Sequence, residues 1–334
     1  MTAAGTRSVW VVTDGKPGME NQCLGLAEAL VTAGDRSGGA SAAFGPPAVK
    51  RIAPRFPWSS LPPQFWVAPL LAPGGSGDRL TPPWPDILIA TGRQTVAPAL
   101  AIRKASGGRT FCVQIQNPVF GRDRFDLLAV PAHDRITGAN VIECRGALHR
   151  VTPAKLAAEA DRFRATLTRL PRPLVAVLIG GSNRQYRMTE AVTRKLAADL
   201  KALCGHHGAG LAVTASRRTG ADNEAILHAA LADCPAYLWD GTGDNPYFGL
   251  LGLADAIAVT ADSVSMVSEA CATGKPVYVI GLDGGSAKFE RFHAGLRDAG
   301  ITRPFDGTLE TWSYDPPNDT AAVAAEIIRR LDAR

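Results

Sequence analysis

The stretch ADAIAVTADSVSMVSEACATGKPVYVIGL, residues 254–282, decides the fold because it predicts a strand, a helix and a second strand in direct succession. Residues 256–259 form a short apolar run rich in β-branched side chains, which is typical of a buried strand. Ser263 then offers a side-chain oxygen to the first free N–H groups of a helix. Gly274 ends that helix, and residues 277–280 form the next strand. This order of elements indicates a parallel α/β sheet.

The predicted helix carries a candidate binding residue. Val264 and Val267 lie on one face, whereas Ser265 and Glu269, four residues apart, lie on the other. Open α/β sheets bind ligands at the carboxyl edge of their strands, where helix N-termini attract phosphate. We expect Glu269 to accept hydrogen bonds from a ribose while the helix end holds a diphosphate. The alternative is a solvated helix residue without a ligand.

Two family resemblances extend this expectation. The pattern Ser-x-Ser-x-x-x-Glu-x-x-x-x-Gly-Lys-Pro, residues 263–276, resembles the donor-binding segment of GT-B glycosyltransferases such as the peptidoglycan N-acetylglucosaminyltransferase. That likeness implies that Glu269 holds the ribose of a nucleotide sugar, with Ser263 and Ser265 near the phosphates. The whole chain more closely resembles the mitochondrial-fission Elm-type domain family. The residues that match this family's motifs are Gln116, Asn117, His133, Asp134, Asn245, Pro246 and Tyr247.

Composition narrows the class of protein. The 334 residues favour two domains, and 46% apolar with 20% charged residues is ordinary for a globular protein. A net charge of +5 suits anionic substrates or an anionic membrane surface and is too diffuse to indicate nucleic acid. Six scattered cysteines without C-x-x-C indicate reduced thiols, and no window reaches the roughly 18 apolar residues of a membrane-spanning helix. We expect a cytoplasmic protein, soluble or peripheral to the membrane.

Residues 1–170 are expected to form an N-terminal Rossmann-like acceptor domain. Its first strand runs into Asp14–Gly18, which is neither a Walker A loop nor a G-x-G-x-x-G fingerprint. Asp14 is the hypothetical base that deprotonates the acceptor, and a purely structural tight turn is the alternative. The Gly-Gly-x-Gly-Gly-His loop of the peptidoglycan enzyme is absent here, so its catalytic residue cannot be carried over. The expected acceptor loop comprises Lys16, Asn21, Gln22 and Asn117.

His133 beside Asp134 is a second catalytic candidate, because imidazole titrates near neutrality. Adjacent residues on an extended chain point apart, which favours a structural histidine over a direct acid/base pair.

A Pro/Trp-rich insertion covers residues 54–85 and contains nine prolines, which forbid a long helix or a central strand. One interpretation is an apolar surface that contacts a lipid acceptor or a membrane. The other, which we favour, is an irregular lid whose aromatic rings cap the N-terminal core.

Residues 171–318 are expected to form a C-terminal Rossmann-like donor domain. Its first strand ends in Gly180, Gly181 and Ser182, which resemble the GGS loop of GT-B enzymes and let the backbone approach a phosphate. Asn183 and Arg184 replace the Gln-Gly that usually follows, and Arg184 supplies a cation.

Other donor-site candidates lie at later strand ends. Arg217 and Arg218 are placed to neutralise a leaving diphosphate without a metal ion, the alternative being surface charge. Asn245 begins a turn in which Tyr247 either covers a nucleobase or sugar or packs in the core. By likeness to GT-B enzymes, Ser286 and Lys288 contact the donor sugar, and a helix within residues 319–334 returns to the N-terminal domain.

Together these features predict a GT-B-like α/β protein with two Rossmann-like domains and parallel sheets facing a central cleft. The expected function is metal-independent glycosyl transfer from a nucleoside-diphosphate sugar, with no cofactor and with a small-molecule or lipid-linked acceptor. Expected partners are the nucleotide sugar and a peripheral inner-membrane contact, not nucleic acid. The alternatives are an epimerase of nucleotide sugars and a non-catalytic scaffold that binds a protein or membrane.

Overall fold

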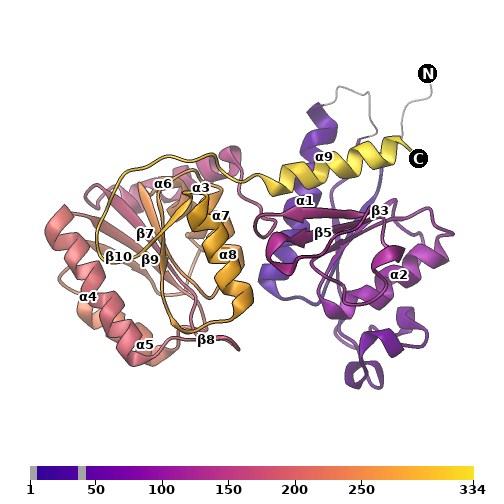
Figure 1. Ribbon diagram of the computed structural model, residues 1–334, viewed down its shortest axis with the longest axis horizontal. Coiled ribbons are helices and arrows are strands. Elements are labelled where there is room, and N and C mark those ends of the chain that lie inside the picture. Colours follow the sequence, from indigo (N-terminus) through magenta and orange to yellow (C-terminus); the bar gives the residue numbers. More distant parts are fainter. Residues whose placement is uncertain (1–5, 37–42) are drawn as a thin grey trace. The chain divides into compact units, whose positions relative to one another are not determined.

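The computed structural model describes residues 6–36 and 43–334 and divides the chain into two compact units (Figure 1). Unit 1 comprises Met1–Arg150 together with Asn318–Arg334, and unit 2 comprises Val151–Pro317.

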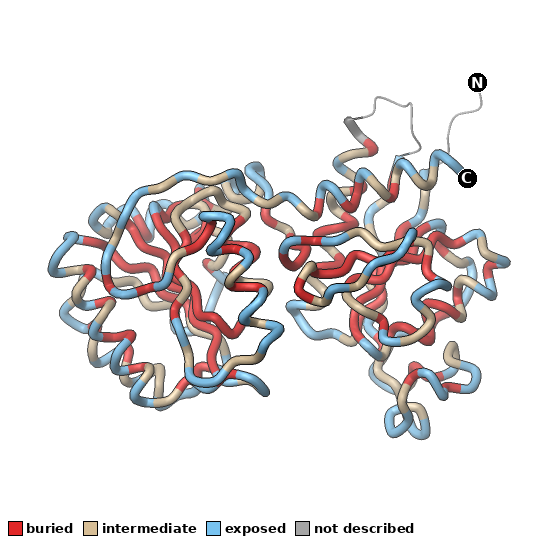
Figure 2. The backbone as a smooth tube through the Cα atoms, in the orientation of Figure 1, coloured by how far each residue is buried: buried red, intermediate tan, exposed pale blue. Residues whose placement is uncertain are grey.

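Unit 1 holds a six-stranded sheet in the order β2-β1-β3-β4-β5-β6, and every neighbouring pair is parallel. The central strands are buried on both faces, as Figure 2 shows in red, which a parallel sheet requires. The strands are β1 (Val9–Thr13), β2 (Ala48–Arg51), β3 (Ile87–Thr91), β4 (Phe111–Ile115), β5 (Leu127–Pro131) and β6 (Val141–Cys144). The helices are α1 (Pro17–Arg36), α2 (Val96–Ala105) and α9 (Asp319–Asp332).

Alternate side chains of these strands enter two separate cores, because successive residues of a strand point to opposite faces. Val11 and Ile89 pack with α1 and α9, whereas Val12 and Leu88 pack with α2.

The insertion between β2 and β3 is built from short 3-10 turns at Trp58–Ser60, Pro63–Phe65 and Pro69–Leu71. Trp66 is buried against Ala97 of α2, so the expected capping lid is correct for this ring. It is wrong for Phe56 and Phe65, which are exposed. The insertion therefore combines a buried base with an apolar outer surface.

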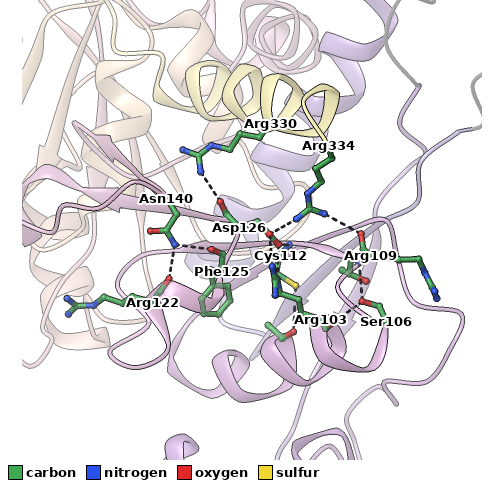
Figure 3. A network of polar contacts seen from close by, with 12 residues as sticks. Arg103, Ser106, Arg109, Cys112, Arg122, Phe125, Asp126, Asn140, Arg330 and Arg334 are labelled. Atoms are coloured by element: carbon green, nitrogen blue, oxygen red, sulfur yellow. Dashed lines mark hydrogen bonds and ion pairs between the residues drawn. The ribbon is translucent and has the colours of Figure 1, made fainter.

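Helix α9 joins the core of unit 1 and is fixed there by a polar network around Asp126 (Figure 3). Arg330 donates to the carbonyl oxygen of Asp126 at 2.9 Å, and Arg334 pairs with its carboxylate. Arg103 of α2 donates to both carboxylate oxygens at 3.0 and 3.1 Å, and the N–H of Cys112 donates at 2.8 Å. Burial alone raises the pKa of Asp126, but these donors together lower it below its usual value.

Unit 2 holds a second six-stranded parallel sheet in the order β10-β9-β7-β11-β12-β14 and a separate antiparallel pair, β13-β8. The strands are β7 (Leu174–Ile179), β8 (Tyr186–Arg187), β9 (Gly210–Ala215), β10 (Ala236–Trp239), β11 (Ala256–Thr260), β12 (Val277–Ile280), β13 (Asp283–Gly284) and β14 (Thr302–Pro304). The helices are α3 (Pro153–Leu167), α4 (Glu190–His207), α5 (Ala221–Leu231), α6 (Tyr247–Leu253), α7 (Val264–Cys271) and α8 (Ala287–Asp298). Residues of α4 and α5 share a core with one face of the sheet, and those of α3, α6, α7 and α8 share a core with the other.

Helix α3 belongs to unit 2, so the division of the chain differs from the one expected at residue 170. The reason is close packing of α3 against α6 at two glycines. A Cβ on Gly249 would lie 2.6 Å from the ring of Phe163, and one on Gly252 would lie 2.6 Å from the carbonyl oxygen of Leu156. Only glycine permits this approach, which ties α3 to the core of unit 2.

Asp126→Asn should lower the free energy of unfolding by about 2–3 kcal/mol at pH 7, because an amide cannot pair with Arg103 and Arg334 as a carboxylate does. Since folding lowers the pKa of Asp126, its stabilisation is complete above the unfolded value of about 3.9 and is lost as the pH falls through the folded value. Denaturant titrations should therefore show a smaller difference in the free energy of unfolding between wild type and variant at acid pH than at pH 7. The control is Asp123→Asn, an exposed aspartate nearby. If Asp123→Asn and Asp126→Asn lowered the free energy of unfolding equally, the polar network around Asp126 would not be what stabilises unit 1.

Candidate functional site

Three loops meet at the carboxyl edge of the unit 2 sheet, those that follow β7, β9 and β11. Asp262, after β11, is 3% exposed and accepts a hydrogen bond from the Thr260 hydroxyl at 2.6 Å. Its carboxylate also forms an ion pair with Arg218, after β9, at 2.8 Å. The N–H of Gly180, after β7, donates to the Thr260 hydroxyl at 2.8 Å. Asp262 and Thr260 thus connect all three loops.

The two glycines after β7 are required by this contact between loops. A Cβ on Gly180 would lie 2.3 Å from a carboxylate oxygen of Asp262. Gly181 has φ +136°, and a Cβ there would lie 2.2 Å from the carbonyl oxygen of Arg218. The carbonyl of Gly180 accepts from the hydroxyl of Thr219 at 2.8 Å. Thr219 therefore holds the loop and does not cap α5, whose N-cap residue is Gly220.

The N–H groups of Gly180, Ser182 and Asn183 in the β7 loop form hydrogen bonds within the protein, and the expected phosphate cradle stays a prediction. Ser182 donates to the carbonyl of Arg218 at 3.1 Å, and Asn183 donates to the carbonyl of Tyr186 at 2.9 Å. The side chain of Asn183 also donates to the carbonyl of Asp262 at 3.1 Å. These residues shape the edge of the sheet.

The three candidate arginines differ in their surroundings. Arg218 is exposed and forms an ion pair with the buried Asp262, and its expected part in neutralising a diphosphate stays a prediction. Arg217 and Arg184 are exposed. All three are therefore accessible to a ligand, and Arg218 differs only in its ion pair with Asp262.

Helix α7 begins beside the connected loops. Ser263 is its N-cap and accepts a hydrogen bond from the N–H of Met266 at 3.3 Å. The N–H groups of Val264 and Ser265 lie in the first turn, where no intrahelical acceptor exists. Ser265 is half-buried. The helix end can therefore present two backbone donors to an anion.

Glu269 lies in the second turn of α7 and is buried, so the alternative of a solvated helix residue is wrong. The hydroxyl of Tyr247 donates to its Oε2 at 2.5 Å. Burial, and then the charge and the hydrogen bond of Glu269, raise the pKa of Tyr247 well above its usual value. Asn245 fixes the start of α6 by accepting from the N–H of Tyr247 at 3.0 Å. Tyr247 thus orients a carboxylate, a role that the sequence did not reveal.

The loop after β12 contributes a cavity of about 510 Å³. Ser286 is the N-cap of α8 and Lys288 is exposed, whereas the cavity is lined by other residues, including Gly281–Gly284 and His293. Burial lowers the pKa of His293, whose Nε2 lies 2.9 Å from the carbonyl oxygen of Ala261. This histidine was missed because a single histidine in an amphipathic helix carries no sequence signal.

The catalytic candidates of unit 1 follow strand ends of its own sheet. Asp14, after β1, forms an ion pair with Lys16. His133, after β5, is buried, with its Nε2 4.0 Å from Asp134 Oδ1. The two lie in a 3-10 turn, so the expectation that they point apart is wrong.

The expected acceptor-loop residues also serve local structure. Gln22 is buried and donates to the carbonyl of Gly18 at 3.2 Å. Asn117 accepts from Arg122 and from the N–H of Val119, both at 3.0 Å. Asn21 is half-buried on α1, and Lys16 is exposed.

A family model described as Mitochondrial fission ELM1 matches residues 17–331. The chain belongs to this family. One relative, the Mitochondrial fission protein ELM1 of Arabidopsis thaliana, is 38% identical over 280 residues, which cover 75% of this chain and 65% of the relative. The chain thus spans just under two-thirds of that ELM1 protein's length.

Solved structures show the fold of this ELM1 family member. The UDP-GlcNAc 2-epimerase of Methanocaldococcus jannaschii, in complex with UDP-GlcNAc and UDP, has a TM-score of 0.57 at 10% identity and covers 98% of this chain and 100% of its own. A putative UDP-N-acetylglucosamine 2-epimerase of Listeria monocytogenes has a TM-score of 0.56 at 11% identity, covering 98% and 96%. The predicted GT-B-like class with two Rossmann-like domains is confirmed. Throughout residues 6–36 and 43–334, no helix has the length and apolar character needed to span a membrane.

Gly180→Ala should lower the free energy of unfolding by about 1–3 kcal/mol, because its Cβ would collide with the buried Asp262 carboxylate. The matched control is Gly281→Ala at the same edge, where a Cβ meets no atom within 4 Å. Thermal melting of the two variants measures the difference. Equal melting temperatures would show that the contact between Gly180 and Asp262 does not constrain the loops.

Proposed function

We propose that unit 2 binds a nucleoside-diphosphate sugar and that the protein transfers its sugar to an acceptor without a metal ion. The observation that carries this proposal is the buried Glu269, oriented by Tyr247 behind the open N-terminus of α7. A carboxylate in that position is suited to a ribose diol, and the helix end is suited to a diphosphate.

Glu269 keeps the capacity to bind a ribose while it accepts from Tyr247. Each carboxylate oxygen has two lone pairs, so the group can accept the Tyr247 hydroxyl together with further donors. Because Glu269 is buried, its hydrogen bonds are stronger than they would be in water. The M. jannaschii epimerase was solved with UDP-GlcNAc and UDP, which makes uridine nucleotides the first to test.

The diphosphate would lie at the N-terminus of α7, and its candidate cations are the exposed Arg184, Arg217 and Arg218, of which Arg218 pairs with Asp262 just before the helix. In the reaction, an oxygen of the acceptor forms a bond to the anomeric carbon of the sugar. The bond from that carbon to the diphosphate oxygen breaks, and the electron pair leaves with the diphosphate. Backbone N–H groups and guanidinium groups stabilise the charge that develops there. Asp14 of unit 1 takes the proton of the acceptor.

The acceptor we propose is a small molecule or a lipid-linked group at the cytoplasmic side of a membrane. A product assay separates transfer from the alternative reaction on the same fold. UDP release that requires an acceptor supports transfer, whereas isomerised UDP-sugar formed without acceptor supports epimerisation. Binding without either product supports a non-catalytic scaffold.

Calorimetric titration with UDP, GDP, ADP and CMP and their sugars tests the binding site. We expect one nucleoside diphosphate to bind and Glu269→Gln to weaken it by about tenfold or more, since the amide loses the charge and one acceptor. Glu190→Gln, at an exposed position on α4, is the matched control and should bind as wild type does. If no nucleotide produces heat or a thermal shift with the wild-type protein, the proposal fails.

A further inference from the structure

The exposed apolar side chains of this protein gather in one region. Of the residues that the structure describes, the exposed large apolar ones are Phe56, Leu61, Phe65, Val67, Leu71 and Val119. The first five form a surface that we call the apolar tip. Phe56 and Val67 are 79% and 82% exposed, values that leave nearly the whole side chain in water. Exposed apolar residues are ordinary when scattered, but a cluster marks a binding surface.

The apolar tip stands on a rigid base. Trp66 and Ala72 are buried against Ala97 of α2, with Trp58 and Phe120 packed beside them. Figure 1 draws this segment in purple next to α2, extending away from the sheet of unit 1. The exposed rings of Phe56 and Phe65 therefore belong to a segment that Trp58 and Trp66 pack against unit 1.

Val119 adjoins the same base through Phe120, the next residue in the chain. Its φ is +71°, a left-handed conformation that β-branched residues rarely adopt. Asn117 holds this turn by accepting from the N–H of Val119. Backbone strain of this kind persists where a surface has a function.

Many polar groups of the tip are bonded within it, which lowers the cost of contact with lipid. Both indole N–H groups find carbonyl partners in the segment, Trp58 with Val67 at 2.7 Å and Trp66 with Leu61 at 2.9 Å. Four positions bring no N–H at all, namely Pro57, Pro62, Pro63 and Pro69. The backbone N–H groups bonded to carbonyls of the same segment include those of Ser60, Leu61, Phe65, Trp66, Leu71 and Ala72.

Basic residues lie within the tip and in the segments beside its base. Arg55 is the single charged residue between Ile52 and Gly77, and its guanidinium lies 5.6 Å from the centre of the Trp58 ring. Arg93 and Arg122 are exposed in the segments that carry Ala97 and Phe120. An apolar surface with a cationic border fits the acyl chains and phosphates of an anionic bilayer.

We propose that the apolar tip inserts into the surface of an anionic lipid bilayer and anchors the protein there. The cluster of exposed apolar side chains with Arg55 at its base is the observation that favours a lipid surface. The proposal concerns unit 1 alone and requires no nucleotide, so its outcome is independent of the proposed sugar transfer.

The test is flotation of the full-length protein with vesicles of phosphatidylglycerol and phosphatidylethanolamine, compared with vesicles of phosphatidylcholine. We expect binding to the anionic vesicles, weakened by salt. The triple variant Phe56→Ser, Phe65→Ser, Val67→Ser should bind at least about tenfold less, since each side chain loses its apolar transfer free energy. Gln64→Ser, an exposed polar position in the same segment, is the matched control and should bind as wild type.

A second measurement covers the case in which the triple variant does not fold. Phe65→Trp places an additional indole on the exposed surface of a chain with six tryptophans. The difference in emission between this variant and the wild type should shift to the blue and be quenched by brominated lipid on addition of anionic vesicles. Absence of wild-type binding to either vesicle would overturn the proposal. So would concentration-dependent self-association that the triple variant abolishes, because the tip would then be an interface between two copies of the chain.

Discussion

The carboxylate of Asp262 occupies the space beside Gly180 that a side chain at that position would need. A Cβ on Gly180 would lie 2.3 Å from a carboxylate oxygen of Asp262. Asp262 is also the buried partner of Arg218 and the acceptor of the Thr260 hydroxyl. A buried carboxylate is costly unless it is paired, so Asp262 depends on both Arg218 and Thr260, and Gly180 leaves the space that it occupies. This constraint holds the ends of β7, β9 and β11 in one arrangement and so defines the carboxyl edge of the unit 2 sheet.

The position of helix α7 follows from that edge. Its N-cap, Ser263, comes directly after Asp262, so the residue that connects the loops also fixes where the helix begins. One turn further on, Glu269 is held by Tyr247, which enters from α6. A ligand that contacts the helix end and Glu269 would therefore meet groups already oriented by the fold, which lowers the entropy lost on binding. The same arrangement leaves Arg184 and Arg217 exposed and pairs the exposed Arg218 with Asp262.

Much of the fold could be predicted from the sequence, because buried parallel strands are continuous apolar runs and their ends are polar. The strands β7 and β11 and the helix α7 were predicted close to their observed bounds. The site was predicted less well, because pairings between loops depend on contacts far apart in the chain. Gly180 was interpreted as part of a phosphate-binding loop, whereas in the structure it leaves space for Asp262, which comes 82 positions later in the chain. The spacing of Glu269 placed it away from the apolar face of its helix, whereas in the structure Tyr247 of α6 packs against it. The boundary between the two domains was predicted at residue 170 and not before α3 for the same reason. The sequence does not reveal that Gly249 and Gly252 allow α3 to pack closely against α6.

The central claim is that the N-terminus of α7 and Glu269 form one wall of a nucleotide site. Hydrogen–deuterium exchange of the full-length protein, with and without saturating UDP, tests it most directly. The account predicts slower exchange of the amides in residues 263–270 and in the adjoining loop 182–185, with the amides at the opposite end of the same sheet, near residues 208–210, unchanged. Protection confined to that opposite end, or to unit 1, would contradict it.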